Sequence, residues 1–278
     1  MLVCSAPMPT LRRALSENED TDAARPLKRS DADEPSSPDA AAAALFANLP
    51  SPAADPASAA PCPRTLAFAR SELAARGESH GLAHAERVRA LALAIYGELR
   101  RANAKVGGAN ARIVEVAALL HDVCDHKYVD PATDAGRACI ERRDRFLAVT
   151  LSAAAAVAVV MVVGTVSYSR EAKALGRGEE PAWAALPEAI QVLRHVVSDA
   201  DKIDAIGVRG LERCAEYAKE RGVRGPLVVA REVAQHCDEK LLRLRGEYVR
   251  TAPVKRRAAP GHAWLAAWRE RAAEVVGF

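Results

Sequence analysis

Histidines and aspartates able to bind a metal recur along the chain at spacings that suit helices. His80 and His84 lie four residues apart at the start of a helical pattern, so they share one face of that helix. His121 and Asp122 follow directly after an apolar helical pattern, Val114 to Leu120. Charge at the edge of a core costs free energy unless something compensates it. The pair therefore predicts a compensating partner such as a bound cation.

Further carboxylates follow in Asp125 and in the segment from Asp199 to Asp204. Two neutral imidazoles with two carboxylates carry a summed charge of −2, which matches a divalent cation. Mixed nitrogen and oxygen ligands suit Mn²⁺, Fe²⁺, Co²⁺, Ni²⁺ or Zn²⁺ better than Ca²⁺. Four protein ligands leave positions for a water and a substrate oxygen, as metal-activated hydrolysis requires. Taken singly, each element also fits a structural role, such as an acidic helix N-terminus.

The elements that must position these residues are helices, and no segment alternates with period two for long enough to predict a strand. The sequence therefore predicts an all-α fold. A last helix carries Trp264 and Trp268 on one face, as core anchors rather than a substrate platform, after chain breaks at Thr251–Pro253 and Pro260–His262. The other predicted helices span residues 66–75, 80–101, 113–122 (with Asn110 as its cap), 132–145, 187–197, 210–221 and 226–244.

Composition narrows the class of protein. The 278 residues include 39 Lys and Arg against 36 Asp and Glu, a net charge of +3 that argues against a nucleic-acid binder working by bulk charge. The six cysteines are widely spread, which excludes a CxxC zinc module and fits a reduced compartment. We expect a cytoplasmic protein, with a nuclear or organellar location left open.

The first part of the chain differs from the rest in composition. Ser16 to Pro38 is rich in acids, Ser and Pro, and five prolines recur between Pro50 and Pro63. Such a segment buries too little apolar surface to offset its ordering entropy. The sequence therefore predicts a disordered tail over residues 1–61 and one helical domain over residues 62–278.

The order His … His-Asp … Asp resembles the HD-domain superfamily of metal-dependent phosphohydrolases, and its small nucleotide-hydrolysing branch most of all. The resemblance covers roughly residues 66 to 275. It rests on three segments of this sequence: Ser79-His80-Gly81-x-x-His84-x-x-Arg87-Val88, Ala117-Ala118-Leu119-Leu120-His121-Asp122-x-x-Asp125-x-Lys127, and Val197-x-Asp199-Ala200-Asp201-Lys202-x-Asp204. Val166-Ser167-Tyr168-Ser169 and His236-x-x-Glu239-Lys240 look like secondary signatures of the same branch.

The resemblance implies a role for each matching residue. Asp125 would orient or deprotonate the attacking water, and Lys127 would act with it on the phosphate. His80 would either support a metal ligand from behind or touch substrate. Arg87 and Lys202 would contact phosphate, with a structural ion pair as an equal alternative. The metal ligands would be His84, His121, Asp122 and Asp201, with Asp199 as the fallback for the last.

An uncharged run, Phe146 to Ser167, is long enough to span a bilayer, which takes about 20 residues. A spanning helix would put Asp122 and Asp201 on opposite sides of the hydrocarbon, where one cation could not bind both. We therefore interpret the run as buried helices broken near Leu151–Ser152 and expect no membrane role.

The function expected from these features is metal-dependent hydrolysis of a phosphoester or phosphoanhydride in a small, nucleotide-like substrate. The alternative is a non-catalytic HD domain that binds a nucleotide or metal and acts through a partner. A membrane-anchored protein that uses the uncharged run is the third reading. No motif marks the oligomeric state.

Overall fold

The computed structural model describes residues 37, 61–77, 80–102 and 111–277. The predicted tail lies almost wholly outside these ranges, as does the predicted cap Asn110. Within the described ranges every regular element is a helix and there is no strand, which confirms the all-α prediction.

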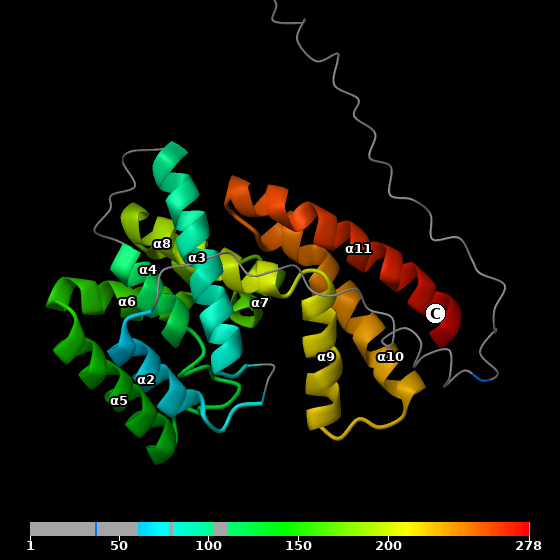
Figure 1. Ribbon diagram of the computed structural model, residues 1–278, viewed down its shortest axis with the longest axis horizontal. Coiled ribbons are helices and arrows are strands. Elements are labelled where there is room, and N and C mark those ends of the chain that lie inside the picture. The colour runs from blue at the N-terminus through cyan, green and yellow to red at the C-terminus, as the bar shows by residue number, and fades with distance from the viewer. Residues whose placement is uncertain (1–36, 38–60, 78–79, 103–110, 278) are drawn as a thin grey trace, which may run out of the picture. The chain divides into compact units, whose positions relative to one another are not determined.

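The larger group of helices surrounds α4, which is buried on nearly all sides (Figure 1). α3 and α8 pack along α4, and α6 covers it from a third direction. This explains why Val116 to Leu120 is an unbroken apolar run, since a helix enclosed by neighbours needs no polar face. The group comprises α2 (Pro63–Leu73), α3 (Leu82–Ala102), α4 (Ala111–Leu120), α5 (Asp134–Thr150), α6 (Ala153–Thr165) and α8 (Glu188–Asp204).

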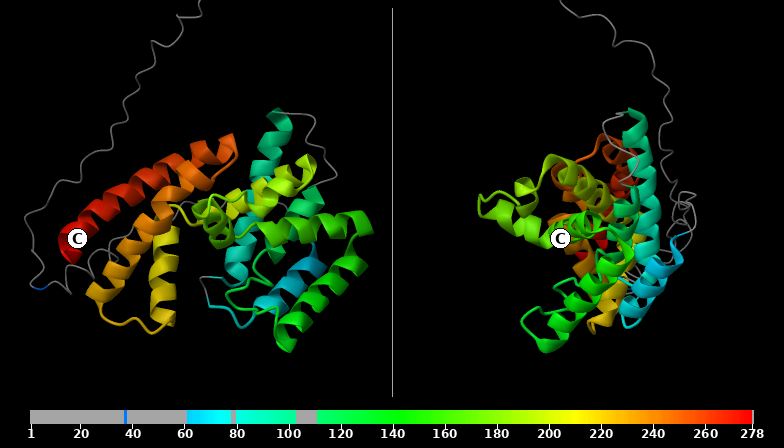
Figure 2. Two further views of the ribbon diagram at one scale, coloured as in Figure 1. Left: turned by 180° about the vertical axis from the view of Figure 1, so that it is seen from behind. Right: turned by 90° about the vertical axis from the view of Figure 1, so that its left-hand side faces the viewer.

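A second group of helices has its own core around Trp268, Leu241 and Leu265. α9 and α10 run side by side as an antiparallel pair, with α11 packed against both (Figures 1 and 2). Trp268 is buried in this core and Trp264 packs at its edge, as predicted for core anchors. The group comprises α9 (Val208–Glu220), α10 (Pro226–His236), the short π-helices η3 (Cys237–Leu241) and η4 (Leu244–Tyr248), and α11 (Ala252–Val276).

The uncharged run forms two helices broken at Leu151–Ser152, which confirms the predicted break. The Ser152 hydroxyl accepts the N–H of Ala155 and caps α6. The prediction that these helices are buried is only half right. Val157 is 53% exposed, and Val160 and Met161 are each 36% exposed, because α4 and α8 cover only one face of α6.

Among the described residues, no single helix combines the length and the hydropathy needed to cross a membrane. α6 and α7 (Tyr168–Gly176) are long and apolar enough only when taken together, and the chain bends by 60° between them. A short 3-10 helix, η2 (Ala182–Ala185), then leads into α8.

The predicted break at Pro260–His262 is wrong, because α11 continues through it, whereas the break before Pro253 is present. Pro260 removes one backbone hydrogen bond, but the helix continues through it, with buried side chains on both sides, Ala258 and Leu265. Gly261 permits close packing: a Cβ there would lie 3.2 Å from the carbonyl oxygen of Ile206.

Candidate metal centre

His84 lies in the first turn of α3 with its ring fully buried. Its Nδ1 is 2.8 Å from Oδ2 of Asp204, so the proton sits on Nδ1. The lone pair is then on Nε2, which has Nη2 of Arg213 at 3.4 Å. Nε2 lies 3.6 Å from Oδ2 of Asp122 and 3.4 Å from Oδ1 of Asp201. A histidine held this way by a carboxylate has the arrangement typical of a metal ligand.

His121 and Asp122 lie in the turn that follows α4. His121 donates its Nδ1–H to the carbonyl oxygen of Ala118 at 2.8 Å, which again leaves Nε2 as the acceptor. Nε2 of His121 and Oδ2 of Asp122 lie 3.4 Å apart, and both are buried without a hydrogen-bond partner. Orphaned polar atoms of this kind are costly unless an ion is bound to them.

Asp201 completes the set from the last turn of α8, with Oδ1 3.9 Å from Nε2 of His121. The sequence suggested that Asp199 to Asp204 opens a helix, but these residues end α8. Carboxylates there oppose the helix macrodipole, so they need nearby cations. Asp204 has them in Arg87 and Arg213, each 3.0 Å from one of its oxygens.

The fallback ligand Asp199 lies away from this cluster. Its carboxylate is fully buried and accepts the backbone N–H groups of Arg250 and Thr251 at 3.0 and 2.6 Å. Successive acids on one helix point in different directions, about 100° apart per residue. Of the two candidates, Asp201 is therefore the one beside the histidines.

The residues present fit a divalent cation. One ligand atom from each of His84, His121 and Asp122 lies within 4.8 Å of the others, and Oδ1 of Asp201 adds a fourth. Ligands about 2.1 Å from one cation lie about 3.0 Å or more apart, so the observed separations need little contraction. Burial by itself raises the pKa of Asp122, but His121 and His84 outweigh it and lower that pKa, which keeps the carboxylate ionised.

A cavity of about 340 Å³ opens beside the cluster. It is lined by Asp125, Lys127 and His80 as well as by three of the four clustered residues, His121, Asp122 and Asp201. Oδ1 of Asp125 accepts the backbone N–H of Lys127 at 2.8 Å. Burial lowers the pKa of His80 to about 3, so this ring is neutral at physiological pH. Arg213 and Lys240 also line the cavity and give it cationic groups suited to phosphate.

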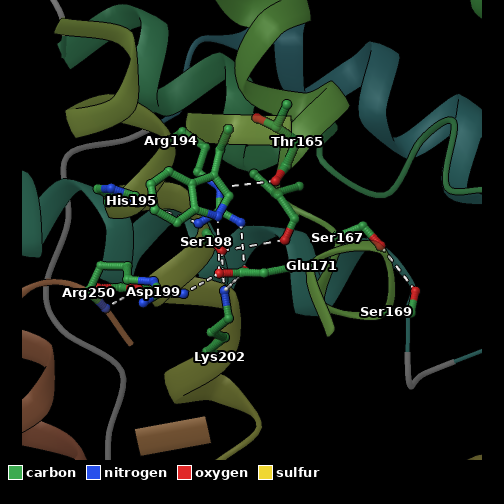
Figure 3. A network of polar contacts seen from close by, with 12 residues as sticks. Thr165, Ser167, Ser169, Glu171, Arg194, His195, Ser198, Asp199, Lys202 and Arg250 are labelled. Atoms are coloured by element: carbon green, nitrogen blue, oxygen red, sulfur yellow. Dashed lines mark hydrogen bonds and ion pairs between the residues drawn. The ribbon is translucent and has the colours of Figure 1, made fainter. Parts of the chain in front are cut away.

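Arg87 and Lys202 both form ion pairs, the alternative that the sequence left open. Arg87 contacts Asp204. Lys202 is buried, with Nζ 3.4 Å from Glu171 and in contact with Ser198 (Figure 3). Arg194 and Arg250 contact the same carboxylate at 2.8 and 2.6 Å. Lys202 nevertheless lines the cavity. Arg87 does not line it and donates to Asp204 instead.

Sequence reasoning missed three residues of the site: Asp204, Arg213 and Lys240. Asp204 had a usable signal, since it follows Asp201 by three residues and shares its face of α8. Lys240 had a signal in the secondary signature His236-x-x-Glu239-Lys240, although no role was assigned to it. Arg213 had none, because it stands in an ordinary amphipathic pattern and reaches the site through the packing of α9.

Comparison with known proteins places this arrangement in a structural class. No family model matches the sequence, and no curated protein matches it. Solved structures do match. YpgQ from Bacillus subtilis, crystallised in complex with ADP, is 23% identical, with a TM-score of 0.54 over 76% of this chain and 92% of its own. A protein from Lactobacillus plantarum gives 23% identity and a TM-score of 0.53 over 77% and 96%.

An HD-superfamily hydrolase from Bacillus thuringiensis is 22% identical to this chain. It matches with a TM-score of 0.50 over 75% of this chain and 92% of its own. Identities at this level establish the fold alone. The structural neighbours, one of them an HD-superfamily hydrolase, therefore show that the chain has the HD-domain fold.

Proposed function

We propose that this protein is a metal-dependent phosphohydrolase that cleaves a phosphoester or phosphoanhydride bond in a nucleotide. The observation that carries the proposal is the pair of buried atoms without hydrogen-bond partners, Nε2 of His121 and Oδ2 of Asp122, within the four-residue ligand set. A cavity with cationic walls adjoins them. A protein that only needs to fold gains nothing from that combination, whereas phosphate hydrolysis needs both parts.

The structural neighbours support the same reading. One of them is an HD-superfamily hydrolase, and another was crystallised in complex with ADP. We transfer from them the reaction class and a nucleotide as the substrate class. Which phosphate bond is cleaved stays open between phosphomonoester, phosphodiester and phosphoanhydride.

His84, His121, Asp122 and Asp201 would hold the cation. When bound, a divalent cation supplies a Lewis acid that neutralises phosphate charge and makes a water molecule more acidic. Asp125 orients this water or takes its proton, since its carboxylate lies in the same cavity and Lys127 fixes one oxygen. Lys127 and Arg213 stabilise the charge that develops on the phosphate.

The test measures metal content and hydrolysis on one purified sample of the full chain. Nucleoside triphosphates, monophosphates and cyclic nucleotides are screened with Mn²⁺, Co²⁺, Ni²⁺ and Mg²⁺. His121→Ala should lose both bound metal and phosphate release, while His262→Ala on α11 should keep both. Metal binding should also raise the melting temperature of the wild type and not that of His121→Ala.

Three outcomes separate the functions. Bound metal with phosphate release that is lost in His121→Ala supports the hydrolase. Bound metal without turnover of any nucleotide favours the non-catalytic binding role. Equal metal content in the wild type and His121→Ala contradicts the proposed ligand set.

A further inference from the structure

A second cavity, of about 670 Å³, lies between α9 and α10. Its walls share Lys127, Arg213 and Lys240 with the metal cavity, together with His80 and Tyr168. The two spaces are therefore adjacent. A molecule with its phosphate at the metal ligands can extend past these shared residues into the larger space.

The walls of the two cavities differ in chemistry. Carboxylates and cations gather around the metal cavity, whose wall also includes the aliphatic side chains of Val129, Ile140 and Val163 and the rings of His80, His126 and Tyr168. The second cavity offers rings: Tyr217 from α9 and His236 from α10, beside His80 and Tyr168. Rings provide flat surfaces for stacking, which aliphatic side chains do not.

Tyr217 is the central ring of this wall. His80 meets it edge-on, with ring centroids 5.9 Å apart. The Arg221 guanidinium lies 5.3 Å from its centroid and is anchored by an ion pair with Glu232. Burial, followed by the charge of Lys240, lowers the pKa of His236 to about 4, so that ring is uncharged at neutral pH. Of the cations that line only this cavity, Arg221 is paired with Glu232 and Arg231 donates to the carbonyl oxygen of Val276, so the rings are left to bind a planar group.

We propose that the cavity between α9 and α10 binds the nucleoside of the substrate, with its base against Tyr217. The assignment rests on the proposed function, because it takes the phosphate to lie at the metal ligands. At about 670 Å³, the cavity falls within the range of small-molecule sites, about 300–1,000 Å³. The aliphatic end of the metal cavity is the competing location for the base.

The experiment compares two non-hydrolysable ligands by calorimetry on the Mn²⁺-loaded full chain. Adenosine 5′-(α,β-methylene)diphosphate carries a nucleoside on a methylenediphosphonate group, and methylenediphosphonate is that group without the nucleoside. Tyr217→Leu removes the ring and keeps apolar bulk. Since base stacking on an aromatic ring is worth about 1–3 kcal/mol, its Kd for the nucleoside ligand should rise about tenfold. Its Kd for methylenediphosphonate should stay within twofold of the wild-type value.

Two matched variants control the experiment. Tyr217→Phe keeps the ring and should bind both ligands like the wild type. Tyr128 also meets His80 edge-on, at 5.5 Å, but lines neither cavity, so Tyr128→Leu should leave both affinities unchanged. Thermal melts of each variant establish that it is folded before binding is compared.

The outcomes separate this assignment from the proposed function. The nucleoside site is wrong if the wild type binds the two ligands with equal affinity, or if Tyr217→Leu binds the nucleoside ligand as the wild type does. Neither result contradicts the proposed hydrolase function. A selective loss of nucleoside affinity in Ile140→Ala instead assigns the base to the aliphatic end of the metal cavity. Binding of neither ligand by the wild type contradicts the proposed function as well.

Discussion

Asp204 organises the metal centre without being one of the proposed ligands. It accepts Nδ1–H of His84 at 2.8 Å and holds Arg87 and Arg213 at 3.0 Å. Burial by itself raises the pKa of Asp204, but the hydrogen bonds from His84 and Arg87 outweigh it and hold the pKa well below its ordinary value. The carboxylate therefore stays ionised and fixes the tautomer of His84.

Asp204→Asn should weaken metal binding about 10- to 100-fold, the usual effect of removing a partner that orients a metal ligand. Titration of the metal-free protein with Mn²⁺ measures this affinity. Asp238→Asn is the matched control, because Asp238 pairs with Arg269 on the surface. Unchanged Mn²⁺ affinity in Asp204→Asn would show that His84 keeps its orientation without the charge.

Asp125→Asn should leave metal content unchanged and slow turnover about 10²- to 10⁴-fold if this carboxylate handles the proton of the attacking water. Steady-state kinetics on the substrate identified by the screen measure the effect. Asp130 stands exposed in the same loop and accepts the N–H of Ala132 at 2.9 Å, so Asp130→Asn should retain the wild-type rate within twofold. Full turnover in Asp125→Asn would remove it from the mechanism.

Among the helices, the turn between α8 and α9 sets the distance between the proposed ligand Asp201 and the cation Arg213. Gly207 has a φ of +100° in this turn, and Gly210 lies in the first turn of α9. A Cβ at position 210 would come within 2.0 Å of the carbonyl oxygen of Ala205. Backbone atoms cannot move aside as a flexible side chain can, so only glycine fits there.

Gly210→Ala should lower the free energy of unfolding by about 3 kcal/mol or more, since the clash is with main chain. Gly222→Ala is the comparison: its φ is +92°, but nothing lies within 4 Å of the added Cβ. Backbone strain alone should then cost about 1–2 kcal/mol. Urea denaturation measures the free energy of unfolding of both variants. An equal decrease in the two would mean that α9 can shift away from α8 to relieve the clash.

At the scale of the whole molecule, Glu171 ties the two groups of helices together. It lies on α7, is 3% exposed, and binds Arg194 and Lys202 of α8 and Arg250 of the segment before α11. Burial by itself raises the pKa of Glu171, but Lys202 and Arg194 outweigh it and lower the pKa to about 2. Stability from this carboxylate is therefore present above its ordinary pKa of about 4.3 and is lost as pH falls towards 2.

Glu171→Gln should cost about 3–5 kcal/mol at pH 7, because it leaves buried cations unpaired. The difference from the wild type should shrink by up to about 3 kcal/mol towards pH 2, where the native carboxylate becomes protonated as well. Urea denaturation at pH 7, 5, 4 and 3 follows the change. Glu247→Gln, which breaks an exposed pair with Arg243, should cost less than about 1 kcal/mol throughout. A pH-independent difference for Glu171→Gln would mean that Glu171 is not the titrating group.

The helices and the residue types of the proposed metal ligands could be predicted from the sequence, because both depend on local pattern. The 3.6-residue period of the apolar residues located α3, α4 and α9. His121 and Asp122 could be recognised because they are polar residues at the end of an apolar helix. The end of α8 could not be located this way, since its acidic turn fits a helix N-terminus equally well. Only packing against His84, Arg87 and Arg213 makes that turn stable as a C-terminus.

Tertiary structure alone decided whatever depends on contacts between distant segments. It kept α11 continuous through Pro260, left one face of α6 exposed, and separated Asp201 from Asp199 by their directions on α8. It also brought the rings of α9 and α10 beside the metal centre. These outcomes follow from how helices pack, and packing sums many weak contacts that no local pattern encodes.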